Sequence, residues 1–222
     1  MLLMKILIIE PCGFMRLGML SVLADHKDIN VTGVENIEEG LIQAEKIKPN
    51  IILVNMTSHC HCTETDSVVS NFLRLRVTSK IYCYLDANYP DHDEPIMIAE
   101  NFLILRKHQV NAILNKIISH TLSKTPATLC TQPFSIFSDQ EVLVIGDWMA
   151  EMPNYRIARK LNISDRTVYV HKRHITQKIK VRNRLEFCFV YNLIKYFHWP
   201  MNPLALRPLS RKIKADIMTL MR

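Results

Sequence analysis

The stretch Ser164-Asp-Arg-Thr-Val-Tyr-Val-His-Lys-Arg-His-Ile-Thr-Gln-Lys-Ile179 decides the fold of the second half of this chain. Together with the preceding Ile157-Ala-Arg-Lys-Leu161, it predicts a helix, a tight turn and a second, basic helix. Val168, Ile175 and Ile179 form an apolar stripe at helical spacing, with His171 partly buried at its edge as a structural residue. The opposite face carries Arg166, Tyr169, Val170, Arg173 and Gln177. A helix-turn-helix that places its second helix in the DNA major groove has this division.

The charge of the chain is concentrated in the same half. The 222 residues carry a net charge of +7, and they are enough for two modest domains. Residues 1–134 hold 12 Lys and Arg against 14 Asp and Glu, whereas residues 135–222 hold 16 against 7. Between Asn154 and Arg184 there are ten basic residues and a single acid, Asp165. This imbalance indicates contact with phosphates, although such a run can also be a solvated helix face.

Capping signals place the helices around this motif. Ser138 followed by Glu141 is a capping box, and it predicts a helix whose buried face includes Val142, Ile145, Trp148 and Met149. Pro153 or Asn154 begins the next helix, which buries Ile157, Ala158 and Leu161. Ser164 then caps the basic helix, with Asp165 at its positive end. A fourth helix is predicted from Leu185 to about Phe197, with Leu185, Phe189, Leu193 and Ile194 at helical spacing.

Four helices in this order resemble the LuxR/NarL-type DNA-binding domain. The matching residues are Glu141, Ile157-Ala158, Leu161, Ile163-Ser164, Arg166-Thr167-Val168, His171, His174-Ile175, Lys178-Ile179 and Val181-Arg-Asn-Arg184. Glu151 departs from the family, which usually has Gly at the end of the first helix. The family match and helix geometry put Tyr169, Val170 and Arg173 against base edges, where an arginine can read guanine and a valine can meet a thymine methyl. Phosphate contacts are expected from Arg166, Thr167, Lys172, Lys178, Lys180 and Arg182.

The first half alternates short apolar runs with amphipathic stretches, which favours a parallel sheet with crossover helices. The expected strands are Lys5–Ile9, Ile29–Val34, Ile51–Val54, Ile81–Leu85 and Phe102–Leu105. The expected helices are Phe14–Ala24, Ile37–Ile47, Ser67–Leu75 and Gln109–His120. Five strands and about five helices predict an α/β, flavodoxin-like doubly wound domain, followed by the all-α helix-turn-helix domain.

This hydrophobic pattern and Arg16-x-Gly18 resemble a response-regulator receiver domain. Receivers carry paired acids after the first strand, a phosphoacceptor Asp after the third, Ser or Thr after the fourth and Lys after the fifth. The matching positions here are Glu10-Pro11, Asn55, Asp86, and Arg106 or Lys107. An amide cannot form an acyl phosphate, and transfer also needs a cation held by several hard oxygen ligands. We therefore expect a pseudo-receiver that is not phosphorylated and serves in association.

The expected organisation is a receiver-like domain over residues 1–121, a linker over 122–134, the DNA-binding domain over 135–197 and an extension over 198–222. The degenerate receiver, Arg16-Leu-Gly18 and Trp148-Met-Ala150 resemble the RcsA group of auxiliary regulators. That resemblance implies a phosphorylation-independent regulator that binds double-stranded DNA, as a homodimer or as a heterodimer with a response regulator. The basic amphipathic stretch Leu209–Arg222 could dock on its own domain, pair with a second subunit or, least favoured, rest on a membrane.

Two other functions stay open from the sequence. Ser58-His-Cys-His-Cys62, with Cys12 near the same sheet edge, could make a metal- or thiol-responsive sensor, although adjacent ligands wrap one ion poorly. A protein-only adaptor that sequesters another regulator is the second alternative. No signal peptide is recognised and the six cysteines are expected to be reduced thiols, so we expect a cytoplasmic protein. None of the five glycines forms a phosphate-cradling motif and no nucleophile motif is present, so neither a cofactor nor an enzyme is expected.

Overall fold

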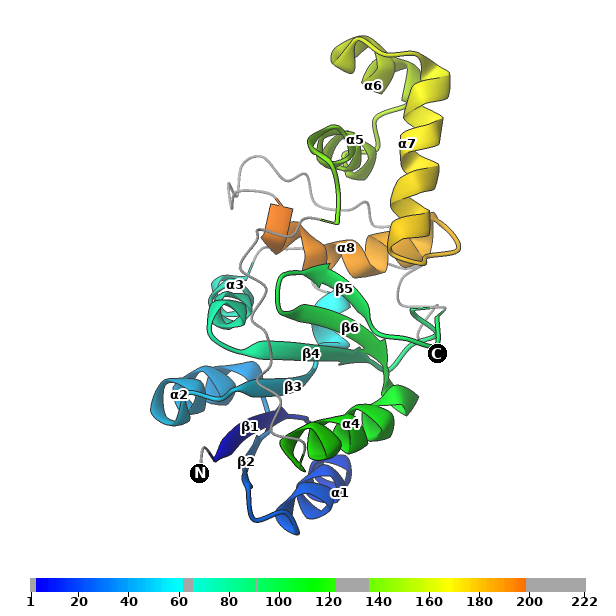
Figure 1. The fold of residues 1–222 in the computed structure, drawn as a ribbon. Coiled ribbons are helices and arrows are strands. Elements are labelled where there is room, and N and C mark those ends of the chain that lie inside the picture. The colour runs from blue at the N-terminus through cyan, green and yellow to red at the C-terminus, as the bar shows by residue number, and fades with distance from the viewer. Residues whose placement is uncertain (1–2, 62–65, 91, 123–135, 199–222) are drawn as a thin grey trace.

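The computed structural model describes residues 3–61, 66–90, 92–122 and 136–198, which form a sheet domain and a helical domain (Figure 1). The strands are β1 (Met4–Ile9), β2 (Ile29–Val34), β3 (Ile51–Asn55), β4 (Lys80–Leu85), β5 (Ile96–Ala99) and β6 (Phe102–Arg106). Their order in the sheet is β2-β1-β3-β4-β6-β5, and all pairs are parallel except β5 with β6. The five predicted strands and the doubly wound α/β arrangement are confirmed.

Helices cover both faces of this sheet. They are α1 (Gly13–Ala24), α2 (Ile37–Ile47), α3 (Ser67–Arg74) and α4 (Val110–Leu122). Figure 1 shows α1 and α4 on one face and α2 and α3 on the other. Alternate residues of β1 therefore enter different cores: Ile6 and Ile8 pack in one, and Leu7 and Ile9 in the other. A strand buried on both faces has to be apolar at every position, which is why β1 reads as a continuous apolar run.

Gly40 lies where α2 approaches β1 closely. A Cβ atom added at Gly40 would lie 2.4 Å from Cδ1 of Ile9. Because such a contact is far inside van der Waals distance, a side chain at this position would force either the end of the Ile9 side chain or α2 itself to shift.

One expectation for the first half is wrong in detail. About five helices were expected, but residues 3–61, 66–90 and 92–122 contain four α-helices and three short 3-10 segments, η1 (Ser58–His61), η2 (Leu75–Val77) and η3 (Lys107–Gln109). The connection between β4 and β6 contains the antiparallel strand β5. Ile96 and Ile98 are buried there whereas Met97 is 43% exposed. This period of two, in so short a run, matches an edge strand better than a helix.

The helical domain follows the capping signals. Its helices are α5 (Asp139–Met149), α6 (Asn154–Leu161), α7 (Asp165–Lys178) and α8 (Arg184–His198). The capping box of α5 is formed: Ser138 N–H donates to Glu141 Oε2 at 2.8 Å, and Glu141 N–H donates to Ser138 Oγ at 3.3 Å. Ser164 Oγ accepts from the N–H of Thr167 at 3.0 Å and caps α7. The sequence therefore predicted the starts of both helices from the correct residues.

Glu151, the departure from the LuxR/NarL pattern, lies in the turn after α5 with a φ of 60°. This left-handed conformation is the one that glycine adopts most readily, because a Cβ atom crowds the following carbonyl there. The turn is formed despite the replacement, and Glu151 Oε1 lies 3.8 Å from Nη2 of Arg184.

Helix α8 is shared by the two domains. Its residues Glu186 to Lys195 are all buried, so the helix is covered on every side. Phe187 stacks on Trp148 of α5 with ring centroids 4.8 Å apart. Phe189 meets His61 of η1 edge-on at 6.0 Å. The helical domain is thus docked on the sheet domain through α8, which Figure 1 shows lying between α5, α7 and the sheet.

The domain limits stay predictions. Helix α4 continues to Leu122, slightly past the expected end of the first domain at residue 121. The expected linker and the C-terminal extension fall almost entirely outside the described residues.

Candidate DNA-binding surface

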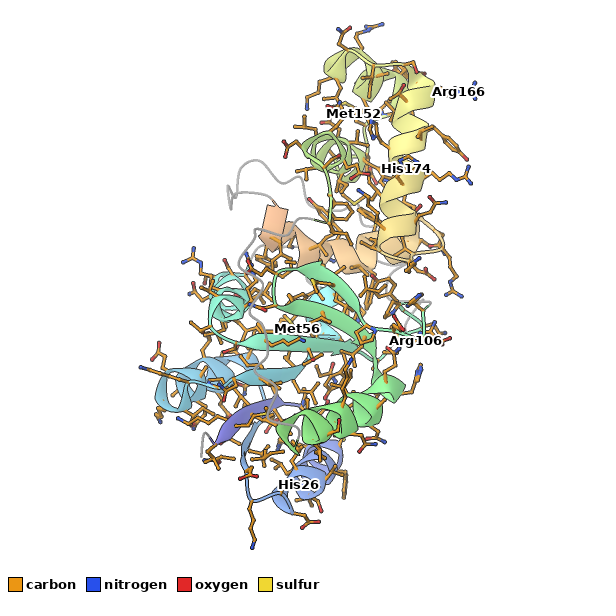
Figure 2. The ribbon with its side chains drawn as sticks, in the orientation of Figure 1. His26, Met56, Arg106, Met152, Arg166 and His174 are labelled. Atoms are coloured by element: carbon orange, nitrogen blue, oxygen red, sulfur yellow. The ribbon has the colours of Figure 1, made fainter. Side chains whose placement is uncertain are left out.

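Helix α7 divides into the two faces that its sequence predicts. Val168, Ile175 and Ile179 are completely buried, and His171 has intermediate exposure. On the other side Tyr169 is 62% exposed and Val170 is 38% exposed, and these are the two apolar side chains expected at base edges. Arg166, Arg173, Gln177 and Lys180 are also exposed, and Thr167 has intermediate exposure. Figure 2 shows Arg166 at the end of α7 that lies farthest from the sheet.

Two buried acids of α5 hold the neighbouring helices in place. Glu141 Oε2 lies 2.6 Å from Nζ of Lys178 in α7, and Asp147 Oδ1 lies 2.6 Å from Nζ of Lys160 in α6. Burial raises the pKa of Glu141, but hydrogen bonds from Lys178 and Ser138 outweigh this effect and leave the pKa below its ordinary value. Glu141 therefore caps its own helix and anchors the end of α7 with one carboxylate.

Lys172 occupies a different environment from the one expected of a phosphate-binding residue. Its Nζ donates to Oδ1 of Asn154 at 2.6 Å and lies 5.1 Å from the centre of the Trp148 ring. Burial, reinforced by the positive charge of Arg184, lowers the pKa of Lys172 to about 8. Because the ammonium is held against α5 and α6, Lys172 contributes to the packing of α7, and its contact with phosphates stays a prediction.

Two more of the expected phosphate-binding cations are paired within the domain. Lys178 is paired with Glu141, as described above. Arg182 donates from Nε to Oε1 of Glu186 at 2.6 Å, while its backbone N–H donates to Oε2 of the same carboxylate. Both side chains are partly exposed, so their contact with phosphates stays a prediction. Their pairing reduces the charge that they offer to DNA.

Three exposed residues of α6 were not among the predicted contacts. Tyr155 is 52% exposed, and the guanidinium carbon of Arg156 lies 5.9 Å from its ring centre. Arg159 is exposed one turn further along. The basic residues between Asn154 and Arg184 include Arg156 and Arg159, but the sequence does not indicate which of these cations are exposed. The structure adds Arg156 and Arg159 to the positive surface beside α7.

At the degenerate phosphorylation site of the sheet domain, the Glu10 carboxylate accepts three hydrogen bonds. Glu10 is buried, and its carboxylate accepts from Cys12 N–H at 2.8 Å, from Asn55 Nδ2 at 3.0 Å and from the Tyr84 hydroxyl. Burial raises the pKa of Tyr84 strongly, and its hydrogen bond to Glu10 raises it further. Nothing in the sequence pattern singled out Tyr84, because a buried strand admits an aromatic residue for packing alone.

The outer part of the same edge carries an ion pair. Asp86 Oδ2 lies 2.6 Å from Nζ of Lys107, and this pairing raises the pKa of Lys107 against the opposing effect of burial. Arg106 instead donates from Nε to the backbone oxygen of Pro90. The sequence left Arg106 and Lys107 as alternatives for the receiver lysine, and the structure brings Lys107 to Asp86. The four expected positions therefore do meet at one edge, although with different chemistry.

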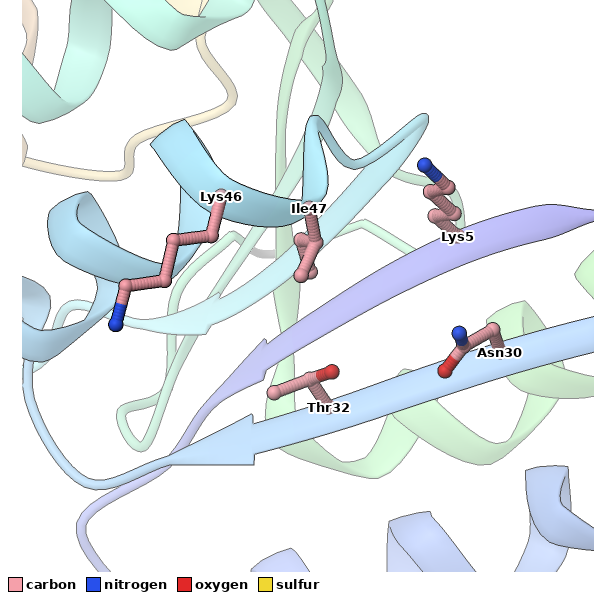
Figure 3. A pocket seen from close by; sticks show the side chains of 5 residues that line it. All are labelled: Lys5, Asn30, Thr32, Lys46 and Ile47. Carbon is pink, nitrogen blue, oxygen red and sulfur yellow. The ribbon is translucent and has the colours of Figure 1, made fainter.

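The other features of the sheet domain offer little chemistry. Within residues 3–61, 66–90, 92–122 and 136–198, no three His, Cys, Asp or Glu side chains are grouped to hold a metal. Cys60 is fully buried, and Cys62 lies outside the described residues. A cavity of about 210 Å³ between α2 and strands β1 and β2 is lined by Lys5, Asn30, Thr32, Lys46 and Ile47 (Figure 3). No described helix has the length and hydrophobicity needed to cross a membrane.

A receiver-like domain without a phosphoacceptor, docked on a basic four-helix domain, defines the class of two-domain transcriptional regulators. The family model "Transcriptional regulator RcsA, N-terminal dimerisation domain" matches residues 5–129, and the model "Bacterial regulatory proteins, luxR family" matches residues 135–190. Because the first of these covers more than half of the sequence, the chain belongs to the RcsA family of transcriptional regulators.

Individual relatives are distant. RcsA of Pantoea stewartii subsp. stewartii is 23% identical over 190 residues, which cover 82% of this chain and 90% of that protein. EntR of Citrobacter freundii is 27% identical over 192 residues, with 82% of this chain and 94% of that protein covered. A solved structure described as two RcsB dimers bound to two parallel DNAs matches 87% of this chain and 97% of its own, with a TM-score of 0.48 and 17% identity.

Proposed function

We propose that this chain is a sequence-specific DNA-binding transcription regulator that works without phosphorylation and together with a partner response regulator. The exposed face of α7 carries the proposal. Tyr169, Val170 and Arg173 are exposed at spacings of one and three residues along α7, and they combine an arginine with two large hydrophobic side chains. This is the set that can distinguish base edges in a major groove.

Basic residues around Tyr169, Val170 and Arg173 would contact the DNA phosphates. Arg166, Thr167 and Lys180 on and after α7, with Arg156 and Arg159 on α6, are accessible. Lys178 and Arg182 would contribute less, because each is already paired with a buried acid. Such contacts give affinity and register, and their strength falls as salt rises.

The absence of phosphorylation follows from the edge around Glu10. Asn55 provides an amide in place of the nucleophilic carboxylate, and it is hydrogen-bonded to Glu10 and to the N–H of Thr57. Asp86 would repel an incoming phosphoryl group, and Pro11 supplies no second acid. We propose no catalytic role for the chain, and we place the protein in the cytoplasm, where a bacterial regulator meets its DNA.

A partner is proposed from the family. The model matched by the first half is described as a dimerisation domain, and relatives in that family carry the name of the RcsA regulator. We propose that the receiver-like domain associates with another receiver-bearing regulator or with a second copy, so that two helix-turn-helix motifs meet adjacent half-sites. The remaining alternatives, a metal or thiol sensor and a protein-only adaptor, gain no support from the described residues.

The test uses Arg173→Ala in the full-length protein, after selection of preferred sites from a random DNA pool. We expect a loss of about 1–3 kcal/mol at the selected site and relaxed preference at one base pair. Arg74→Ala is the matched control, since Arg74 is an exposed arginine of α3 in the sheet domain. Unchanged selectivity of Arg173→Ala, measured by fluorescence anisotropy, would remove α7 as the reading element.

A further inference from the structure

A path of hydrogen bonds connects the degenerate phosphorylation site to the DNA-binding domain. Asn55 Nδ2 donates to Glu10 at 3.0 Å, and Asn55 Oδ1 accepts from Thr57 N–H at 3.0 Å. The backbone of Thr57 accepts from Cys60 N–H at 3.2 Å as the chain turns into η1. At the other end of this turn, Cys60 O accepts from Asn192 Nδ2 in α8 at 2.7 Å. The two asparagines therefore hold opposite ends of one short segment.

Strand β4 fixes the same segment from the side. Thr57 Oγ1 accepts from the N–H of Asp86 at 2.8 Å, and Asp86 is in turn paired with Lys107. The turn between β3 and η1 is thus held by Asn55 at the end of β3 and by Asp86 just after β4. The position of this turn is therefore tied to the sheet edge.

Helix α8 contacts this turn through the buried Asn192 and contacts other parts of the sheet domain through aromatic side chains. Asn192 is only 2% exposed, so its amide has no water as a substitute for Cys60 O. Further along α8, the Tyr196 hydroxyl accepts from Asp66 N–H at 2.9 Å, and Phe197 packs on Phe102 of β6 at 4.8 Å. A buried carbonyl left without its donor costs about 1–3 kcal/mol, so the shape of η1 matters for docking.

We propose that Asn55 and Asn192 are positioning residues that together fix the recognition helix relative to the receiver-like domain. Asn55 sets the conformation of η1 from the sheet edge, and Asn192 recognises that conformation from α8. The neutral amide at position 55 is suited to this role, because an aspartate there would place a second carboxylate about 3 Å from Glu10, a spacing at which like charges repel. The site that receivers use for phosphate is used here as a fixed joint between the domains.

The joint can be tested without DNA, so its outcome is independent of the proposed function. Spin labels are attached through non-natural amino acids at Ile42 of α2 and Tyr155 of α6, both more than half exposed. Pulsed electron spin resonance then gives the distribution of distances between the domains in the full chain. We expect one narrow distribution for wild type, and a population of displaced distances about tenfold larger in Asn55→Ala and in Asn192→Ala.

Asn115→Ala, on an exposed position of α4, is the matched control and should keep the narrow distribution. The double variant Asn55→Ala/Asn192→Ala should be no more displaced than either single variant, because both substitutions undo the same contact. If a residue only stabilises the sheet domain, its replacement should lower the melting temperature of that domain. The distance distribution of the molecules that remain folded should then stay narrow. If Asn55→Ala does not fold, Thr57→Val is used instead, because it removes the side-chain oxygen through which the end of β4 holds the same turn.

Two results would overturn the proposal. Narrow distances in folded Asn55→Ala would show that the sheet edge does not control docking, even if Asn192→Ala broadens them. If the displaced population of the double variant equals the product of the increases in the two single variants, the two asparagines act separately. If Thr57→Val is the variant measured, a distance distribution as narrow as that of wild type would likewise show that the sheet edge does not control docking.

Discussion

Lys172 directs its ammonium at the Trp148 ring and the Asn154 amide, so its charge lies against the domain that carries it. Sequence position alone put it among the phosphate contacts, since it lies next to Arg173 on a basic helix. One helical step separates the two side chains by about 100°, enough to turn one toward α5 and leave the other exposed. Lys178 and Arg182 differ from Arg166 and Arg173 for another reason: their side chains are partly exposed but paired with the acids Glu141 and Glu186.

Replacing Lys172 with methionine should change how stability depends on pH. The folded-state pKa of Lys172, about 8, is below its ordinary value of 10.5. Below pH 8 the lysine is charged in both states, so the wild type carries the full penalty of burying the charge. This penalty fades between pH 8 and 10.5, where the folded protein loses its proton first. The gain in unfolding free energy of Lys172→Met over wild type should therefore be largest near neutral pH.

Urea unfolding at about pH 7 and about pH 9.5 checks this prediction. Lys116→Met, at an exposed position of α4, is the control and should show no such change in its difference from wild type. An equal gain for Lys172→Met at both pH values would mean that the ammonium is not destabilised by its surroundings.

At the scale of the helices, Lys180 should act as an ordinary phosphate contact. It is exposed just after the end of α7, and within residues 3–61, 66–90, 92–122 and 136–198 no acid forms an ion pair with it. Lys180→Ala should weaken binding to all DNA sequences alike and reduce the slope of log affinity against log salt by about one. Anisotropy titrations over a salt series measure that slope. A change in sequence preference instead would indicate a base contact.

The turn between α5 and α6 gives a second prediction at this scale. Glu151 holds a φ of 60°, and its ion pair with Arg184 is long and exposed. Glu151→Gly should raise the unfolding free energy by about 1 kcal/mol, because a glycine adopts this conformation without the Cβ clash. Glu151→Ala loses the same ion pair and keeps the Cβ atom, so it should not be stabilised. Equal unfolding free energies of the two variants in urea would show that the Cβ atom at position 151 does not destabilise the turn.

At the scale of the whole molecule, α6 and α7 project from the end that lies away from the sheet (Figure 1). The exposed face of α7 is therefore accessible while α8 keeps the domains docked. Incubation with Mg²⁺ and acetyl phosphate should leave the protein mass unchanged and the DNA affinity within about twofold, since no phosphoacceptor is present. Intact-mass spectrometry and anisotropy check the two statements. A mass increase that maps to the edge around Glu10 would contradict them.

Much of the fold followed from local patterns. The apolar runs predicted five of the six strands, and Ser138, Glu141 and Ser164 marked two helix starts correctly, because capping depends on residues only three positions apart. The strand β5 was missed, since a four-residue apolar run does not distinguish a strand from part of a helix. The division of α7 into a buried and an exposed face could be predicted from the sequence. Which basic residues of the helical domain form ion pairs could not be predicted, because this depends on the acids Glu141, Asp147 and Glu186.

By itself the sequence determined the two domain types, the missing phosphoacceptor and the division of α7 into two faces, because each depends on residue identity or on spacing within one element. Only the tertiary structure decided that Tyr84 and Asn55 fill the acidic edge around Glu10, that Lys172 turns inward, and that α8 is buried between the domains. These features depend on contacts between residues far apart in the chain, such as Asn192 with Cys60. No local period or capping rule encodes which distant partner a buried polar group will find.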